Sequence, residues 1–304
     1  MRSDDDSWDI TSSVGVTALG VAAMRAAETR RPDALFADPF AEPLVVAAGA
    51  PVWSRIVRGE FGPGEQEAAE SYAPLIASIV ARTCYFDAYF AAAEAAGIRQ
   101  FVLVASGLDA RAYRMEWPAG SVVFELDLPA VLDFKAAALA GYQPRADRRA
   151  VPVDLRQDWP KALLDNGFDP AAETAWLVEG LLRYLPVDAQ DRLLDDIVAL
   201  SAPGTRVALN TLLEQSEGAG ERRRERAAHS AHLGLGIDLD QLFYPIEGRA
   251  HPVEWFDRRG WSTFAADPVE VLTGHGRAVT TAEAEEIGRH ILMTAIRPGG
   301  DSTR

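Results

Sequence analysis

Short apolar runs and helical patterns alternate through the middle of the chain. Five runs have the length of a buried strand: residues 100–105, 121–126, 150–153, 174–179 and 205–210. The segments between them have helical spacing or helix-start signals, notably residues 111–117, 129–140, 158–166 and 187–200. Strands that alternate with helices predict a parallel, right-handed, doubly wound α/β sheet. Later segments predict a helix over 251–259 and strands over 261–264 and 289–296, whereas residues 267–286 carry no clear pattern.

A different, helical pattern fills the chain before the first strand. Apolar residues recur at helical spacing over 13–29, and Asp38-Pro39 has an acid followed by proline, which is typical of a helix start. A loop at 61–64 precedes a long helical stretch over 65–96 with a break at Pro74. We therefore expect residues 1–96 to form an N-terminal helical cap packed on a core of residues 97–304. A charged segment, 215–245, predicts a helical lid inserted after the fifth strand.

Composition narrows the classes of function. The 304 residues are 48% hydrophobic, enough for one large α/β domain with additions. A formal net charge of −15 repels phosphate backbones and anionic lipid, so neither nucleic acid nor membrane is an expected partner. The chain has one cysteine, which excludes an intrachain disulfide and fits a cytoplasmic location. No apolar run reaches about 18 residues, the length of a membrane span, and the scattered histidines predict no metal site. The oligomeric state stays open.

The end of the first apolar run is the most informative stretch. It closes on Ala105-Ser106-Gly107, and Asp109 follows two positions later. Glycine has no Cβ, so backbone there can take unusual dihedral angles and come close to a ligand. Ligands of open α/β sheets bind outside the carboxyl ends of the strands, where this turn would lie.

The next strand ends carry carboxylates. Asp127 stands about 20 residues after Gly107, the spacing at which dinucleotide-type folds place the acid that binds ribose hydroxyls. The third and fourth runs close on Asp154 and Glu179. One terminal acid is usually a solvated strand end or a helix cap. Four successive strand ends with glycine or a carboxylate favour one ligand-binding edge.

Motifs spread over nearly the whole chain make it resemble a known family. It is similar to the leucine carboxyl methyltransferase-like group of class I S-adenosylmethionine-dependent methyltransferases, and within it to an actinobacterial, largely mycobacterial, group. The motifs are Ser13-Val-Gly-x-Thr17-Ala, Arg25-Ala-Ala-Glu28-Thr, Asp38-Pro-Phe, Arg82-Thr-x-Tyr-Phe-Asp87, Ala105-Ser-Gly-Leu-Asp-Ala-Arg-Ala-Tyr-Arg114, Glu125-Leu-Asp127-x-Pro129, Asp154-Leu-Arg-Gln-Asp-Trp-Pro160 and Glu179-Gly-Leu-Leu-x-Tyr184-Leu. Together they imply a Rossmann-like methyltransferase core that uses S-adenosylmethionine.

The resemblance also implies roles for individual positions on the cofactor. Gly107 and its neighbours Ala105, Ser106 and Asp109 would pass under the methionine part. Asp127 would accept from both ribose hydroxyls, because a carboxylate is an acceptor-only group.

At the two ends of the cofactor, the resemblance implies further contacts. Asp154 and Leu155 would contact the adenine. Arg82 would pair with the methionine carboxylate, whose shape a guanidinium fork matches, and Glu179 would lie near the amine or sulfonium. Arg25 would add a second contact from the cap.

The acceptor side of the site depends on the residues after Glu179. Tyr184 carries a hydroxyl that would orient the acceptor oxygen, so we take it as the candidate catalytic residue. Arg183 departs from the family pattern, which has an apolar residue there. A cation beside the acceptor pocket favours an anionic acceptor such as a carboxylate. A solvent-facing Arg183 with Tyr184 in the core is the open alternative.

The leading hypothesis is therefore an S-adenosylmethionine-dependent methyltransferase acting on an oxygen of a small-molecule acceptor, either a carboxylate or a hydroxyl. Such a transfer needs no strong base, so catalysis can rest on positioning and desolvation. A nicotinamide-dependent oxidoreductase is disfavoured, because Ser106-Gly107-Leu-Asp109 lacks the glycines of G-x-G-x-x-G that admit a pyrophosphate. A non-catalytic protein that binds S-adenosylmethionine stays open, since its binding residues would be the same.

Overall fold

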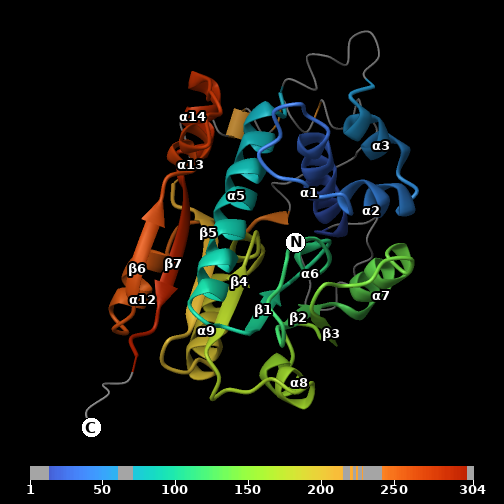
Figure 1. Cartoon of the computed structure of the whole chain (residues 1–304). Coiled ribbons are helices and arrows are strands. Elements are labelled where there is room, and N and C mark those ends of the chain that lie inside the picture. The colour runs from blue at the N-terminus through green and yellow to red at the C-terminus, as the bar shows by residue number, and fades with distance from the viewer. Residues whose placement is uncertain are drawn as a thin grey trace.

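A seven-stranded sheet forms the centre of the molecule (Figure 1). The computed structural model describes residues 14–60, 71–214, 220–221, 224, 228 and 242–299. The strands are β1 (Gln100–Val104), β2 (Val122–Asp127), β3 (Asp147–Pro152), β4 (Thr174–Val178), β5 (Arg206–Leu212), β6 (Ser262–Ala266) and β7 (His290–Ile296). Their order is β3-β2-β1-β4-β5-β7-β6; the first five pair in parallel, and β7 is antiparallel to both β5 and β6.

Helices cover both faces of this sheet. They are α1 (Val14–Thr29), α2 (Ala41–Ala47), α3 (Pro51–Arg58), α5 (Ala73–Ala95), α6 (Arg111–Arg114), α7 (Pro129–Ala138), α8 (Trp159–Asp165), α9 (Val187–Ala199), α12 (Pro252–Asp257), α13 (Pro268–Gly274) and α14 (Thr281–Ile287), with a 3₁₀ turn η1 (Leu182–Tyr184). The doubly wound, mostly parallel sheet predicted from the sequence is confirmed.

The alternation of side chains along each strand builds two separate cores. In β1, Phe101 and Leu103 pack with residues of α1 and α5, whereas Val102 and Val104 pack with residues of α8, α9 and α12. Successive side chains of a strand point to opposite faces, so an apolar run buried on both sides needs a helical layer on each. This explains why the strand runs are continuously apolar rather than alternating.

The helices before β1 gather around α5. Figure 1 shows α1, α2 and α3 on one side of α5, and α13 and α14 on the other. Ala77, Val80 and Cys84 of α5 pack with Leu272 and Ile287. The C-terminal helices thus join the N-terminal ones, and the division into a cap of residues 1–96 and a core of residues 97–304 stays a prediction.

Helix α5 is long and apolar enough to cross a membrane by length and composition alone, and half of its most apolar window is buried in the structure. Phe86 and Phe90 pack it into the core beside the sheet. This burial is typical of a core helix.

Several element boundaries differ from the sequence prediction. The second helix begins at Ala41 rather than at Pro39, although Asp38 Oδ1 still accepts from the N–H of Ala41 at 3.1 Å. The segment predicted as helix over 111–117 is helical only over Arg111–Arg114. The third strand begins earlier than predicted, at Asp147, because β3 is a sheet-edge strand that tolerates charged residues.

Three short helices were not predicted: α3, α13 and α14. They have seven or eight residues each, too few for a helical period to stand out. Their start signals are nevertheless present, since Asp267 caps α13 and Thr280 with Glu283 forms a capping box on α14. The predicted loop at 61–64, the start of the stretch at 65–96 and most of the lid at 215–245 lie outside the described residues.

Candidate functional site

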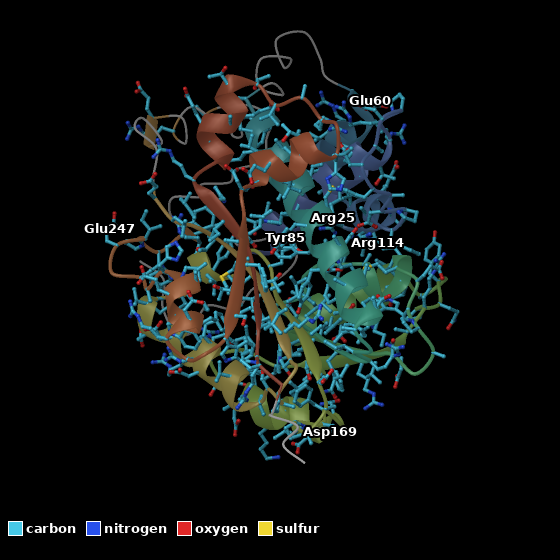
Figure 2. All side chains as sticks on the ribbon, turned by 60° about the vertical axis from the view of Figure 1, so that its left-hand side comes forward. Arg25, Glu60, Tyr85, Arg114, Asp169 and Glu247 are labelled. Carbon is cyan, nitrogen blue, oxygen red and sulfur yellow. The ribbon has the colours of Figure 1, made fainter. Side chains whose placement is uncertain are left out.

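The strand order brings the predicted site residues to one edge of the sheet. Because β3, β2, β1 and β4 are parallel neighbours, their carboxyl ends meet at the same edge. Along this edge lie Asp154, Asp127, Gly107 and Glu179, in that order. In Figure 2, Arg25, Tyr85 and Arg114 gather between the helices and the sheet, whereas Asp169, from the loop before β4, lies at the far end of the molecule. The polar rim inferred from the sequence is therefore one continuous edge.

The turn after β1 has an unusual backbone and is tied to Asp127. Ala105 has φ 53° and Gly107 has φ 50°, both in the left-handed region. The N–H of Gly107 donates to Asp127 Oδ2 at 2.6 Å, and the N–H of Leu128 donates to Asp127 Oδ1 at 2.7 Å. Each carboxylate oxygen keeps a free lone pair for a further donor.

The surroundings of this turn suit a polar ligand. Burial raises the pKa of Asp127 above its usual range, although the N–H groups of Gly107 and Leu128 partly oppose this. The buried hydroxyl of Ser106 has no hydrogen-bond partner among the described residues. A side chain at Gly107 would be strained by the positive φ, and its Cβ would meet Ala18 at 3.6 Å. The turn thus offers backbone, a hydroxyl and a carboxylate at one place.

Glu179, at the end of β4, is held by two arginines. Arg82 Nε donates to its Oε1 and Arg111 Nη1 to its Oε2, both at 2.8 Å. Burial alone would raise the pKa of Glu179, but the charges of Arg111 and Arg82 outweigh it and lower that pKa. Glu179 is therefore an ionised carboxylate with both oxygens already hydrogen-bonded.

Arg82 reaches Glu179 from α5 by passing over Gly180. A Cβ at Gly180 would lie 3.5 Å from Arg82 Nη1 and 3.6 Å from Nη2, and Gly180 has φ 65°. The Gly180 N–H is fixed by Asn210 Oδ1 at 2.8 Å. These are ordinary van der Waals distances, so it is the positive φ that favours glycine at this position. Arg82 and Glu179, predicted separately as contacts to the cofactor, thus lie beside each other, and their contacts with the cofactor stay predictions.

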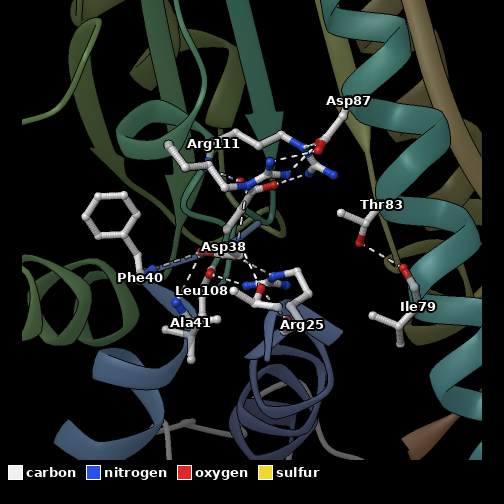
Figure 3. A network of polar contacts seen from close by, with 12 residues as sticks. Arg25, Asp38, Phe40, Ala41, Ile79, Thr83, Asp87, Leu108 and Arg111 are labelled. Carbon is white, nitrogen blue, oxygen red and sulfur yellow. Dashed lines mark hydrogen bonds and ion pairs between the residues drawn. The ribbon is translucent and has the colours of Figure 1, made fainter. Parts of the chain in front are cut away.

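Arg111 is the centre of a larger ionic network that was not identified from the sequence. Its guanidinium contacts Asp109 and Glu179 through Nη1. Its Nε donates to Asp87 Oδ1 at 2.8 Å, as Figure 3 shows. Arg114 makes two further hydrogen bonds to Asp87, at 2.7 and 2.6 Å. Burial opposes the charge of Arg111, but these carboxylates hold its pKa well above the usual range. Arg111, Asp87 and Arg114 lie in the motifs quoted above, yet no spacing shows which carboxylate each cation meets.

Arg25 occupies a different position from the one expected of a cofactor contact. Its Nε donates to Asp38 Oδ2 at 2.9 Å and its Nη2 to the carbonyl oxygen of Leu108 at 2.7 Å, as Figure 3 shows. Arg25 therefore holds the backbone of the turn after β1. A direct contact to the cofactor stays a prediction.

Asp154 and Leu155 follow β3 at the opposite end of the edge. Asp154 accepts from the backbone and guanidinium of Arg156, whose hydrogen bond lowers the pKa of this carboxyl. Leu155 is partly buried and packs against the second core. Both residues lie at the expected strand end, at some distance along the sheet edge from the Arg111 network.

Tyr184 and Arg183 lie on η1, just after β4. The Tyr184 hydroxyl donates to Thr17 Oγ1 of α1 at 3.1 Å. The Arg183 guanidinium carbon lies 4.9 Å from the centre of the Phe243 ring, and Arg183 Nε donates to the Tyr244 carbonyl at 3.3 Å. Both side chains are partly buried, so Arg183 does not simply point into solvent and Tyr184 does not sit in the closed core.

His290, the first residue of β7, was not singled out from the sequence. It pairs in register with Leu212 at the end of β5, so it lies at the same sheet edge as Glu179. Burial, helped by the positive charges of Arg82 and Arg183, lowers the pKa of His290 to about 4, and the charge of Glu286 partly opposes this. The imidazole is therefore neutral at neutral pH.

Comparison with known proteins identifies the family. The sequence profile of the family described as leucine carboxyl methyltransferase matches residues 18–198, which include most of α1, the turn after β1 and η1. The chain belongs to the leucine carboxyl methyltransferase family. The family resemblance stated from the motifs is confirmed.

Relatives of high identity span the whole chain. A protein of Mycobacteroides abscessus named "Putative S-adenosyl-L-methionine-dependent methyltransferase" is 51% identical over 95% of this chain and 96% of its own length. A protein of Mycolicibacterium smegmatis with the same printed name is 48% identical over 97% of this chain and 98% of its own. Among solved structures, a crystal structure titled as that of a methyltransferase from Thermobifida fusca has a TM-score of 0.49 and 18% identity, over 92% of this chain and 94% of that chain.

Membership of the leucine carboxyl methyltransferase family confirms the predicted enzyme class, a methyltransferase dependent on S-adenosylmethionine. It favours methyl transfer over the nicotinamide-dependent alternative. The residues present fit this cofactor, because the positive-φ turn, the unpartnered Ser106 hydroxyl and the Asp127 carboxylate lie together at the sheet edge. The role of each residue on the cofactor stays a prediction.

Proposed function

We propose that this leucine carboxyl methyltransferase family member transfers the methyl group of S-adenosylmethionine to an oxygen atom of a small-molecule acceptor, a carboxylate or an acidic hydroxyl. The observation that carries the oxygen assignment is the place of Arg183, a cation on η1 just after the end of β4 that carries Glu179. Positive potential stabilises an anionic oxygen nucleophile and disfavours a protonated amine.

Each residue of the sheet edge has a role in this proposal. Asp127 accepts from the ribose hydroxyls through its free lone pairs, and Gly107 with Ser106 lies under the methionine part. Asp154 and Leu155 bind the adenine. To do so, Asp154 gives up part of its contact with Arg156. These contacts orient the cofactor, whose sulfonium supplies an electrophilic methyl group.

At the acceptor end, Arg82 and Glu179 act together. Arg82 donates to Glu179 through Nε, so its two Nη groups, which lie beside Gly180, are left to bind a ligand carboxylate. Glu179 stays ionised and therefore attracts the positive end of the cofactor. Tyr184 orients the acceptor oxygen, and Arg183 neutralises its charge. No proton has to be removed from a carboxylate, so the chain needs only to position the reactants and exclude water.

A small acceptor agrees with the charge of the whole chain. The net charge of −15 opposes nucleic acid as a substrate. Cytoplasmic action is part of the proposal, because a chain with one cysteine forms no intrachain disulfide and suits a reducing compartment.

The test is a transfer assay with purified wild-type protein and S-adenosylmethionine labelled on the methyl group. We expect label to pass to carboxylic acids or phenols in a panel that also holds amines and thiols, with anionic members preferred. Calorimetry with S-adenosylhomocysteine and with NAD on the same sample separates the classes, and we expect heat only from the first.

Two results contradict the proposal in distinguishable ways. Label found only on amines or thiols refutes the oxygen acceptor while leaving the methyltransferase class intact. Tight binding of S-adenosylhomocysteine without single-turnover transfer to any acceptor supports the non-catalytic alternative.

A further inference from the structure

Two buried cations from different helices hold two consecutive carbonyl groups of the turn after β1. Arg25 Nη2, from α1, donates to the carbonyl oxygen of Leu108 at 2.7 Å. Lys135 Nζ, from α7, donates to the carbonyl oxygen of Asp109 at 2.9 Å. Both side chains are at least nine-tenths buried, with exposed fractions of 9% for Arg25 and 0% for Lys135. Side chains from α1 and from α7 therefore bind the same turn.

Each cation has its own fully buried acid. Asp38 accepts from Arg25 Nε at 2.9 Å, and Glu125 lies 2.8 Å from Lys135 Nζ. Burying two ion pairs carries a large desolvation cost, and well-packed apolar residues of similar size are often as stabilising or more so. Stability alone therefore does not explain why both cations reach the turn.

The conformation of the turn supplies a reason. Ala105 carries a side chain in the left-handed region, which is disfavoured for any residue with a Cβ, and Gly107 is left-handed too. Such a backbone persists only when its surroundings hold it in place. The Leu108 and Asp109 carbonyls are fixed by the two cations, while the Gly107 N–H is fixed by Asp127. Together these contacts hold the 105–111 segment at three successive residues.

We propose that Arg25 and Lys135 are positioning residues that hold the 105–111 turn in its cofactor-binding conformation before the cofactor arrives. The inference rests on the proposed function, in that the turn receives S-adenosylmethionine. Neither cation has to touch the cofactor. A turn that is already ordered loses less conformational entropy when the ligand binds, so the clamp raises affinity by preorganisation.

The chain contains a matched control for this idea. Three residues after Arg25 on the same helix, Glu28 forms a largely buried ion pair with Arg277, at 2.8 Å. Its side chain is 0% exposed, as is that of Asp38. This pair ties α1 to the segment after α13 and makes no contact with the turn. Arg277→Met therefore removes the cation of another largely buried ion pair that α1 makes, without touching residues 105–111.

The experiment compares Arg25→Met, Lys135→Met and Arg277→Met with wild type by calorimetry with S-adenosylhomocysteine, by thermal unfolding, and by hydrogen exchange of residues 105–112 without ligand. We expect Arg25→Met and Lys135→Met each to weaken affinity by about tenfold, which corresponds to a turn that is in its binding conformation in about a tenth of the unbound molecules. Exchange in 105–112 should speed up in both. Arg277→Met should lower the melting temperature while affinity and exchange of the turn stay as in wild type.

The clamp is refuted if Arg25→Met and Lys135→Met bind as wild type does, or if Arg277→Met loses as much affinity as they do. Lys135→Met keeps Glu125 paired, because Arg148 Nε also donates to Glu125 at 2.7 Å, so this variant tests the clamp even if Arg25→Met does not fold. Wild type that binds no S-adenosylhomocysteine would contradict the proposed function instead. The clamp is then judged by exchange alone, and unchanged exchange in both variants overturns it.

Discussion

At the scale of single residues, Asp127 shows how a strand-end acid is tuned for a ligand. It accepts from two backbone N–H groups, yet burial still raises its pKa. A group whose pKa is raised by folding destabilises the folded chain when it is ionised at neutral pH. The charge of Asp127 therefore does not serve stability, and binding is the function that accounts for it.

Asp127→Asn separates these two effects. Asparagine removes the charge and keeps one oxygen for the N–H of Gly107, but its amide group then faces the N–H of Leu128. We expect the gain and the loss in stability to offset each other, so that the melting temperature stays near that of wild type. We expect affinity for S-adenosylhomocysteine to fall by about 1.5–3 kcal/mol, or ten- to a hundredfold, through loss of charge-assisted hydrogen bonds. Asp147→Asn, at the opposite end of the neighbouring strand, is the control and should leave affinity unchanged. Equal affinity of wild type and Asp127→Asn would make Asp127 a structural residue only.

The sequence allowed some of these residues to be identified and not others. Gly107, Asp127 and Glu179 each follow an apolar run, so the end of the run marks them. Arg111 and Lys135 lie on helices, and their long side chains reach partners that helical spacing does not specify. Contacts of this kind depend on how α6 and α7 sit against the sheet, which is a property of the folded chain.

At the scale of elements, α5 connects the helical layer to the site. It presents Arg82 and Asp87 to the sheet edge, packs Phe86 and Phe90 into the core and receives α13 and α14 on its other side. The strands were predictable because continuous apolar runs define them. The C-terminal helices were not, because seven residues give two turns of pattern and only their caps mark them. Their packing against an N-terminal helix involves contacts between distant parts of the sequence.

Arg82→Lys tests the role of α5. A lysine can pair with Glu179, but one ammonium cannot also form a fork with a ligand carboxylate. We therefore expect weaker binding of S-adenosylhomocysteine by about tenfold or more, and in wild type we expect the ligand to slow hydrogen exchange in α1 and α5. Arg206→Lys is the control, since Arg206 contacts the far end of α5 at the Ala92 carbonyl. If Arg82→Ala binds S-adenosylhomocysteine as wild type does, and hydrogen exchange in α5 is the same with and without the ligand, Arg82 does not hold the cofactor.

At the scale of the whole molecule, an acidic chain carries a site in which most cations are paired with acids. The net charge is −15, and Arg82, Arg111 and Arg114 bind Glu179, Asp109 and Asp87 at the carboxyl edge of the sheet. Arg183 lies at the same edge on η1, beside the Phe243 ring. The many surface acids keep the protein away from polyanions, while Arg183 offers a local attraction for a small anion. His290 lies at this edge too, where burial first, and then the charges of Arg82 and Arg183, lower its pKa.

The stability of the protein should therefore depend on pH through His290. Its pKa is about 4 in the folded chain and about 6.5 when unfolded. Between these values the unfolded chain binds more protons than the folded chain. The contribution of His290 to the free energy of unfolding is therefore fully present above pH 6.5 and is lost as pH drops toward 4. The loss is at most about 1.4 kcal/mol per pH unit. The nearby Glu286 carboxylate opposes the shift, and the raised pKa of Asp127 acts in the opposite direction at the acid end.

Urea unfolding of wild type and His290→Gln at pH 7.5, 6.5, 5.5 and 4.5 measures the effect as the difference between the two curves. We expect that difference to narrow or reverse in favour of His290→Gln as pH falls, whereas His275→Gln, a change at an exposed histidine, should follow wild type. Parallel curves for wild type and His290→Gln would show that His290 is not held neutral.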